Sequence, residues 1–123
     1  MISLICKQYG IINYTVNDDG SIDVNGDVNL SWYKLTELPL SFNKVTGDFY
    51  CSHNVLTSLK GSPKWVGGYF SCEDNNLTNN YCDSEIGGYF YTSLKQDRLT
   101  KDNYNEWRKM YKRKMILDDI FNM

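Results

Sequence analysis

Residues 47–59 read Gly-Asp-Phe-Tyr-Cys-Ser-His-Asn-Val-Leu-Thr-Ser-Leu, and the same pattern returns at residues 68–78 as Gly-Tyr-Phe-Ser-Cys-Glu-Asp-Asn-Asn-Leu-Thr. A looser copy occupies residues 26–38, and a fragment, Gly-Tyr-Phe-Tyr-Thr, begins at residue 88. The leading glycines Gly26, Gly47, Gly68 and Gly88 are therefore 21, 21 and 20 residues apart. A fixed period of this length is typical of stacked supersecondary units, so the chain is predicted to form a solenoid.

Each unit begins with a short strand. Phe49 and Cys51 alternate with polar residues, which is the pattern of a strand with one buried face. Because every coil returns to the same edge, we expect parallel strands centred on residues 28–30, 49–51, 70–72 and 90–92. Single apolar residues, Val45, Val66 and Ile86, are expected to close each turn. The residues predicted to be almost wholly buried are Phe49, Leu56, Leu59, Phe70 and Leu77.

An asparagine stands three residues after the second strand position of two units, as Asn54 and Asn75. An asparagine side chain both donates and accepts hydrogen bonds and tolerates tight turns. We expect Asn54 and Asn75 to turn the chain and to bond backbone groups of the neighbouring coil, which otherwise lose water without gaining a partner.

The pattern apolar-x-apolar-x-x-Asn-x-Leu-Thr-x-Leu resembles the leucine-rich repeat, in the short bacterial form of about 20 residues found in secreted effectors of enteric pathogens. The sequence of residues 66–78, Val-Gly-Gly-Tyr-Phe-Ser-Cys-Glu-Asp-Asn-Asn-Leu-Thr, is similar to repeat sequences of the small leucine-rich-repeat proteins of tailed bacteriophages. The resemblance covers roughly residues 20–92, and the chain departs from it after Leu77. It implies an α/β repeat solenoid and a viral accessory role: binding, and inhibiting, a host protein such as a defence or nucleic-acid-processing factor.

One domain accounts for the length, 1–123, with three parts. Residues 1–25 are predicted to be an N-terminal cap with a short helix at 2–9 and a hairpin around residues 17–20, Asn-Asp-Asp-Gly. Residues 26–95 hold the repeats, and residues 96–123 form a C-terminal helical cap. The apolar periodicity after Thr100 is that of an amphipathic helix, which we expect to cover the last coil.

Composition excludes several classes of protein. The net charge of −2 does not indicate global steering toward nucleic acid or acidic membranes. There is no apolar run long enough for a transmembrane helix, and the N-terminus lacks the basic leader and cleavage site of a signal peptide. The predicted compartment is therefore a bacterial cytoplasm, that of the host if the protein is viral.

The four cysteines do not predict a metal site. Cys51 and Cys72 are one repeat apart and occupy equivalent inward positions, where they are expected to be reduced core residues. Zinc sites use closely spaced pairs such as Cys-x-x-Cys, and the chain has none. A disulfide between Cys51 and Cys72 is the alternative, which a reducing compartment disfavours. Cys6 and Cys82 have no assigned role.

Enzymatic activity is not expected. The one histidine, His53, lies in the turn after a strand, with Asp74 and Tyr33 near it in repeat register. This set does not make an acid–base constellation, and the chain has no phosphate-binding loop or nucleophile motif. No catalytic residue, cofactor or metal is therefore predicted.

The exposed strand positions form the predicted binding surface. Repeat register aligns Asp27, Asp48, Tyr69 and Tyr89 in one column, Asp23, Asn29, Tyr50, Ser71 and Tyr91 in a second, and Ser31, Ser52, Glu73 and Ser93 in a third. Tyrosines on a rigid sheet offer large amphipathic area with few rotors to freeze, as protein interfaces favour. The candidate partner-binding residues are Asp48, Tyr50, Tyr69, Glu73, Tyr89 and Tyr91. The alternative explanation is that tyrosines simply suit strands.

The C-terminal helix provides a second hypothesis. Its basic residues, including Arg108, Lys109, Lys112 and Arg113, could contact nucleic-acid phosphates. They could equally be the solvated face of a cap, or the helix could dock into a protein partner. A third possibility is a structural or virion-associated repeat protein. The identity of the partner and the oligomeric state stay open at this point.

Overall fold

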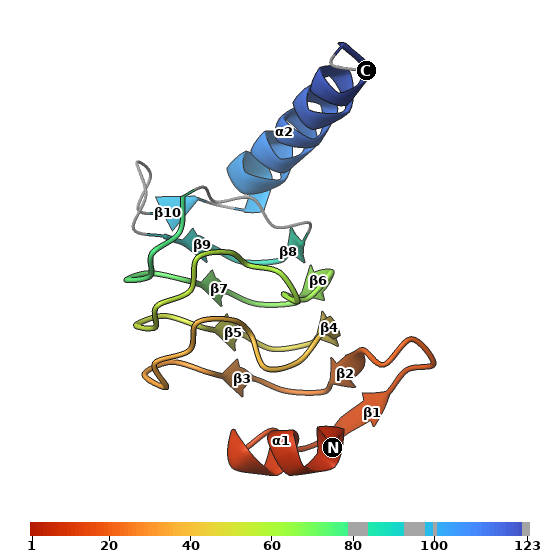
Figure 1. Cartoon of the computed structure of the whole chain (residues 1–123), viewed down its shortest axis with the longest axis vertical. Coiled ribbons are helices and arrows are strands. Elements are labelled where there is room, and N and C mark those ends of the chain that lie inside the picture. The colour runs from red at the N-terminus through yellow and green to blue at the C-terminus, as the bar shows by residue number, and fades with distance from the viewer. Residues whose placement is uncertain (79–83, 93–97, 100, 122–123) are drawn as a thin grey trace.

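The computed structural model describes residues 1–78, 84–92, 98–99 and 101–121, and within them the chain winds into a stack of coils (Figure 1). Each complete coil adds one strand to each of two sheets. Sheet A has the order β1 (Tyr14–Val16), β2 (Ile22–Val24), β4 (Phe42–Val45), β6 (Trp65–Val66) and β8 (Glu85–Ile86). Sheet B has the order β10 (Arg98–Leu99), β9 (Phe90–Tyr91), β7 (Phe70–Ser71), β5 (Phe49–Tyr50) and β3 (Val28–Asn29).

Sheet B confirms the strands predicted from the repeat. Its strands β3, β5, β7 and β9 pair in parallel, and Phe49 lies opposite Val28 on one side and Phe70 on the other. The pairing keeps the register of the repeat, so equivalent residues of successive coils lie side by side. The antiparallel pairs β1–β2 and β10–β9 close one edge of each sheet.

Apart from its first two strands, which form the predicted hairpin, sheet A was not predicted from the sequence. Val45, Val66 and Ile86 do close each turn, and they do so as buried residues of parallel strands in register with one another. Both helices lie at the ends of the stack, and the described parts of the coils consist of strands and turns (Figure 1). The molecule is therefore a β-solenoid-like stack with helical ends.

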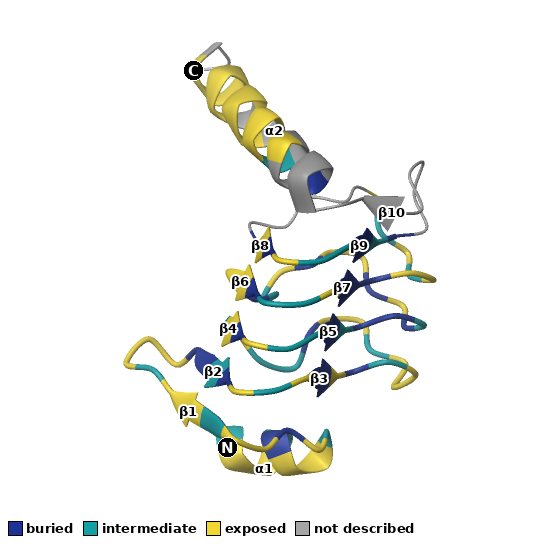
Figure 2. Cartoon of the chain, turned by 180° about the vertical axis from the view of Figure 1, so that it is seen from behind, coloured by how far each residue is buried: buried dark blue, intermediate teal, exposed yellow. Residues whose placement is uncertain are grey.

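The core fills the space between the two sheets: in Figure 2 the strands β3, β5, β7 and β9 are mainly buried, whereas β4, β6 and β8 are buried on one side and exposed on the other. Phenylalanines from successive coils contact each other, with ring centroids 5.1 Å apart for Phe49–Phe70 and 5.3 Å for Phe70–Phe90. Leu56 and Leu59 are buried as predicted. The prediction for Leu77 is wrong, because this side chain is only half-buried against the core. It lies at the end of the last regular repeat, where the sequence pattern also stops.

The asparagines bond to the backbone as predicted. The Nδ2 of Asn54 donates to one carbonyl oxygen of the previous coil, that of Leu30 (2.9 Å), and to two of its own coil, those of Cys51 and Ser52 (both 3.1 Å). Its Oδ1 accepts from two amides of the previous coil at 3.0 Å, those of Tyr33 and Leu35. Asn75 bonds in the same way one coil further on. These bonds satisfy buried backbone groups that no strand pairs.

The repeated glycines allow the coils to approach closely. A Cβ atom on Gly68 would overlap the carboxylate of Asp48, and one on Gly67 would overlap the backbone carbonyl of Thr46. The contact between coils therefore requires glycine at the start of the later units, at Gly47, Gly68 and Gly88, because a side chain there would push the coils apart.

The N-terminal part covers the first coil. Helix α1 (Ile2–Gln8) lies below β3 in Figure 1 and buries Cys6, whose thiol has a raised pKa because of burial. The predicted hairpin is formed by β1 and β2, and its turn is held by Asp19, which accepts from the amide (2.9 Å) and hydroxyl (2.6 Å) of Ser21. These bonds lower the pKa of Asp19.

Helix α2 (Lys101–Phe121) is the predicted C-terminal helix, and of its side chains whose burial is described, those of Tyr104 and Arg108 near its start are not exposed. Tyr104 is buried, with its ring stacked on Phe90 at 4.4 Å between centroids. The rest of the helix extends away from the stack (Figures 1 and 2). Neither helix of the described residues is both long and apolar enough to cross a membrane.

Candidate functional site

The outer face of sheet B gathers the predicted partner-binding residues. Inward residues such as Phe49 alternate with outward ones such as Tyr50 along each short strand. The pairing of β3, β5, β7 and β9 aligns Asn29, Tyr50, Ser71 and Tyr91 in one column. The residues just before these strands, Asp27, Asp48, Tyr69 and Tyr89, form the neighbouring column. We call these two columns, together with Glu73, the sheet B face.

One residue was predicted in the wrong place. Asp23 does not belong to the column of Tyr50, because it lies in β2 of sheet A, opposite Lys44. There its carboxylate accepts from Asn43 (2.8 Å) and Asn17 (3.2 Å), which lowers its pKa. The error arose because only one strand per coil was expected. Ser93, assigned to the third column, lies outside the described residues.

The early part of the sheet B face is acidic. The Oδ1 of Asp27 accepts from the amide of Asp48, and the Oδ1 of Asp48 accepts from the amide of Tyr69, both at 2.8 Å. Each carboxylate is thus fixed by the next coil. The hydroxyl of Tyr50 donates to the other oxygen of Asp48 at 2.7 Å, and this bond, with burial and the nearby charge, raises the pKa of Tyr50 to about 12.

The late part of the sheet B face is aromatic. Tyr69, Tyr89 and Tyr91 have ring centroids 5.7 to 6.1 Å apart in all three pairs, which makes a contiguous tyrosine cluster. Tyr69 is 41% exposed and the other two are half-buried, so each ring packs against its neighbours and still meets solvent. Such rings are already ordered before a partner arrives, which lowers the entropic cost of binding.

Glu73 adds a carboxylate beside this cluster. Its Oε1 accepts from the hydroxyl of Ser71 at 3.3 Å, and Ser71 lies opposite Tyr91 in the sheet. Ser52 and Ser71, expected on the surface, are instead buried and share a hydrogen bond of 2.7 Å between their hydroxyls. All six predicted partner-binding residues therefore lie on one face, with serines filling the space between them.

The basic residues of helix α2 lie elsewhere. Arg108 is half-buried, with its Nη2 3.9 Å from Glu85 of sheet A, whereas Lys109, Lys112 and Arg113 are exposed on the extending part of the helix. The helix contacts β8 and β10. The structure thus separates the two predicted sites: a sheet face and a helix.

A column of turn residues was not recognised from the sequence. Trp32, His53 and Asp74 are one repeat apart, and all three have the left-handed backbone conformation, shortly after the strands β3, β5 and β7. The indole of Trp32 stacks on His53 at 4.1 Å, and the Nδ1 of His53 lies 3.0 Å from the Oδ2 of Asp74. Asp74 was expected near His53, but Trp32 takes the place given to Tyr33. The 21-residue spacing of Trp32, His53 and Asp74 is the sequence signal from which this column could have been predicted.

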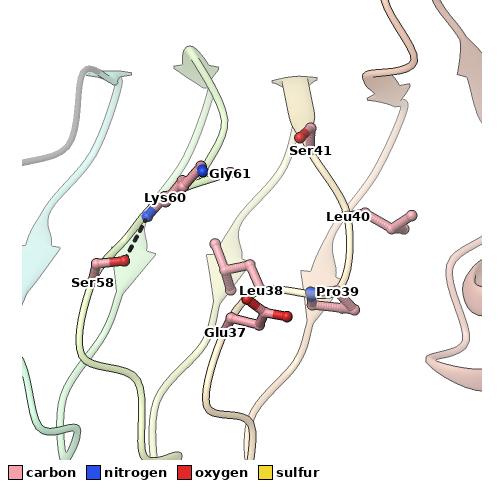
Figure 3. A pocket seen from close by; sticks show the side chains of 8 residues that line it. All are labelled: Glu37, Leu38, Pro39, Leu40, Ser41, Ser58, Lys60 and Gly61. Carbon is pink, nitrogen blue, oxygen red and sulfur yellow. Dashed lines mark hydrogen bonds between the residues drawn. The ribbon is translucent and has the colours of Figure 1, made fainter.

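A shallow pocket of about 260 Å³ lies on the return segments of the first two coils (Figure 3). Its lining residues are Glu37, Leu38, Pro39, Leu40, Ser41, Ser58, Lys60 and Gly61. They include one carboxylate, that of Glu37, and one amine, that of Lys60, but no histidine or cysteine.

The described part of the chain contains the one histidine and three of the four cysteines. Within it, no group of three or more His, Cys, Asp or Glu side chains is placed to hold a metal ion. Cys6, Cys51 and Cys72 are buried thiols, and the Sγ of Cys72 donates to the carbonyl oxygen of Tyr91 at 3.3 Å. The inward positions of Cys51 and Cys72 are as predicted, while Cys82 lies outside the described residues.

Comparison of the chain with protein-family models, with curated protein sequences and with solved structures gives no match. The candidate site therefore rests on the geometry described above.

Proposed function

We propose that this chain is a non-enzymatic protein-binding module of the leucine-rich-repeat type, and that the sheet B face is its binding surface. The observation that carries the proposal is the tyrosine cluster of Tyr69, Tyr89 and Tyr91 next to the fixed carboxylates of Asp27 and Asp48. Aromatic rings held on a rigid scaffold are the usual anchors of protein interfaces.

The charges of this face favour one kind of partner. Its two columns contain Asp27 and Asp48 but no lysine or arginine, and Glu73 lies beside them. The phosphates of a nucleic acid would be repelled by these carboxylates. A protein surface with basic residues beside an apolar patch would complement both the carboxylates and the tyrosine cluster. The proposed partner is a protein with such a patch.

The resemblance to bacteriophage repeat proteins extends the proposal to a biological role. On that basis the chain is a viral accessory protein in the cytoplasm of a bacterial host, where it binds and inhibits a host protein. A defence factor or a nucleic-acid-processing factor is the class of target that the resemblance implies. The resemblance is carried by residues 66–78 and the repeat period.

The test is affinity capture from bacterial lysate, followed by measurement of the dissociation constant for the captured protein. Replacing Tyr69 and Tyr91 together by alanine should weaken binding by at least about 2 kcal/mol, or roughly 30-fold, a typical hot-spot effect. Trp65→Ala is the matched control, because Trp65 is a partly exposed aromatic residue on sheet A that stacks with Lys44. It should leave binding unchanged.

A nucleic-acid-binding role for α2 is the second candidate, favoured by the exposure of Lys109, Lys112 and Arg113. Changing these three residues to glutamate should abolish nucleic-acid binding and leave capture of a protein partner intact. If the charge-reversed variant alone loses its activity, and that activity falls steeply with salt, the helix is the binding site and the sheet B face is not.

A further inference from the structure

The first two coils bring Asn25, Gly26 and Thr46 together. Asn25 and Gly26 lead from β2 into β3, Thr46 leads from β4 into β5, and the two segments lie side by side in the stack (Figure 1). Asn25 and Thr46 are 21 residues apart and hold equivalent positions of their repeats, where the next coils have Gly67 and Gly87. Asn25 and Gly26 form the one Asn-Gly pair in the sequence.

The hydroxyl of Thr46 is hydrogen-bonded to both members of this pair. Its Oγ1 accepts from the amide of Gly26 at 2.8 Å and donates to the Oδ1 of Asn25 at 3.0 Å. A hydroxyl has one proton to donate and lone pairs with which to accept, so the two bonds are compatible with each other. One group therefore bridges the backbone amide and the side-chain amide, and it can take a proton from the first while it gives one to the second.

The surroundings leave these atoms open to reaction. Asn25 and Thr46 are exposed, and a Cβ atom added to Gly26 would meet nothing within 4 Å outside the neighbouring residues. Gly26 also has a φ of 139°, in the region that favours glycine. The nitrogen of Gly26 is therefore not shielded from the side chain that precedes it, and water can reach the product.

We propose that Asn25 is a site of spontaneous modification, at which the fold promotes loss of the side-chain amide with Thr46 as the catalytic residue. The nitrogen of Gly26 attacks the Cγ of Asn25. Its proton passes to the Oγ1 of Thr46, and the hydroxyl proton of Thr46 passes to the Oδ1 of Asn25. Because the two reacting groups belong to adjacent residues, the attack is intramolecular and its entropic cost is low.

The intermediate then loses ammonia. The Oδ1 proton moves to the Nδ2 of Asn25, the carbonyl forms again, and the bond between Cγ and Nδ2 breaks, which leaves a succinimide ring. Water opens this ring at either carbonyl to give aspartate or isoaspartate. The reaction needs water as its sole co-reactant and acts once on the chain itself, so it is independent of the binding role proposed above.

The product changes the junction of the first two coils. It adds a carboxylate two residues before Asp27 of the sheet B face. Isoaspartate also adds a carbon atom to the main chain, directly before Gly26, whose carbonyl oxygen accepts from the amide of Gly47 at 3.0 Å. This hydrogen bond between coils is therefore expected to weaken as the modification accumulates.

Peptide mapping by mass spectrometry, during incubation of the folded chain at neutral pH, measures the reaction. Asn25 should lose its amide, and enzymatic methylation of isoaspartate should label the product. Thr46→Val keeps the branched shape and removes the hydroxyl, so it should slow the loss by at least about tenfold, since general acid–base catalysis typically contributes more than this. Thr46→Ser keeps the hydroxyl and should retain the wild-type rate. Circular dichroism checks that both variants are folded.

Two results would overturn the proposal. If Thr46→Val reacts as fast as the wild type or faster, the hydroxyl does not promote the reaction and at most protects the Gly26 amide. The wild type unfolded in urea gives the rate that the sequence alone supports, and the folded chain should react faster. An Asn25 that reacts equally fast in both states, or faster in urea, would show that the fold does not promote its modification.

Discussion

At the scale of single residues, Asn54 connects the sequence pattern to the fold most closely. Its amide makes five hydrogen bonds to backbone groups of two coils. An alanine cannot replace any of them, and the groups left behind stay buried because Asn54 is only 7% exposed. The side chain thus substitutes for strand pairing where the chain turns.

Asn54→Ala should therefore lower the free energy of unfolding by about 3 kcal/mol, the effect of leaving buried polar groups unsatisfied. Urea denaturation measures it. Asn76→Ala is the control, because Asn76 is an exposed asparagine beside the equivalent turn, and it should change stability by less than about 0.5 kcal/mol. Equal effects of the two substitutions would contradict the role given to Asn54.

The hydrogen bond between Tyr50 and Asp48 makes a prediction about pH. Tyr50 is predicted to ionise at about pH 12 in the folded protein, compared with an ordinary pKa of 10.0. The protonated form is the one that the fold stabilises, so this contribution to stability is complete below pH 10 and is lost as the pH rises from 10 to 12. Ultraviolet titration of the wild type against Tyr50→Phe isolates this group.

Asp48→Asn should move the Tyr50 titration toward pH 10, because it removes the charge and the strong acceptor that oppose ionisation. If Tyr50 already titrates at pH 10 in the wild type, the two side chains are not bonded as described.

At the scale of elements, the sequence predicted one sheet and missed the other for a physical reason. Each of the strands β3, β5, β7 and β9 has one inward residue, such as Phe49, and a second buried residue directly follows the strand, such as Cys51, which makes the alternation visible over three positions. The strands β6 and β8 contain one buried residue beside an exposed one, Trp65 or Glu85, and alternation cannot be recognised over two residues. Only the stacking of coils shows that they form strands.

The candidate site, too, could be predicted from the sequence only in part. Repeat register was sufficient to place Tyr50, Tyr69, Tyr89 and Tyr91 on one face, because parallel strands keep equivalent residues adjacent. It did not show that Asp48 is fixed by Tyr50 and by an amide of the next coil, since these bonds depend on side-chain direction. Nor did helical periodicity in α2 show how little of the helix the last coil covers.

The close approach of coils at the glycines can be tested by a double-mutant cycle. Gly68→Ala should lower stability by about 1–3 kcal/mol, because its methyl group overlaps the carboxylate of Asp48. Adding Asp48→Ala should recover part of this loss, since the obstructing group is a side chain.

Gly67→Ala provides the contrast, because its methyl group meets the backbone carbonyl of Thr46. Truncating the side chain with Thr46→Ala should recover nothing. Recovery in both cycles, or in neither, would mean that the coils are not spaced as the structure has them.

At the scale of the whole molecule, the solenoid presents two separate surfaces. The sheet B face is acidic and aromatic and is held rigid by stacked coils, whereas α2 extends from the last coil with exposed apolar and basic residues. The first is proposed to bind a partner protein.

The most direct test of the binding surface is hydroxyl-radical footprinting of the chain, free and in complex with the captured partner. Tyr69, Tyr89 and Tyr91 should be oxidised more slowly in the complex, because the partner covers their exposed ring edges. Trp65 on sheet A and Met110 on α2 should react at the same rate in both states. Protection of Met110 or Trp65 with the three tyrosines unchanged would contradict the assignment of the sheet B face as the site of binding.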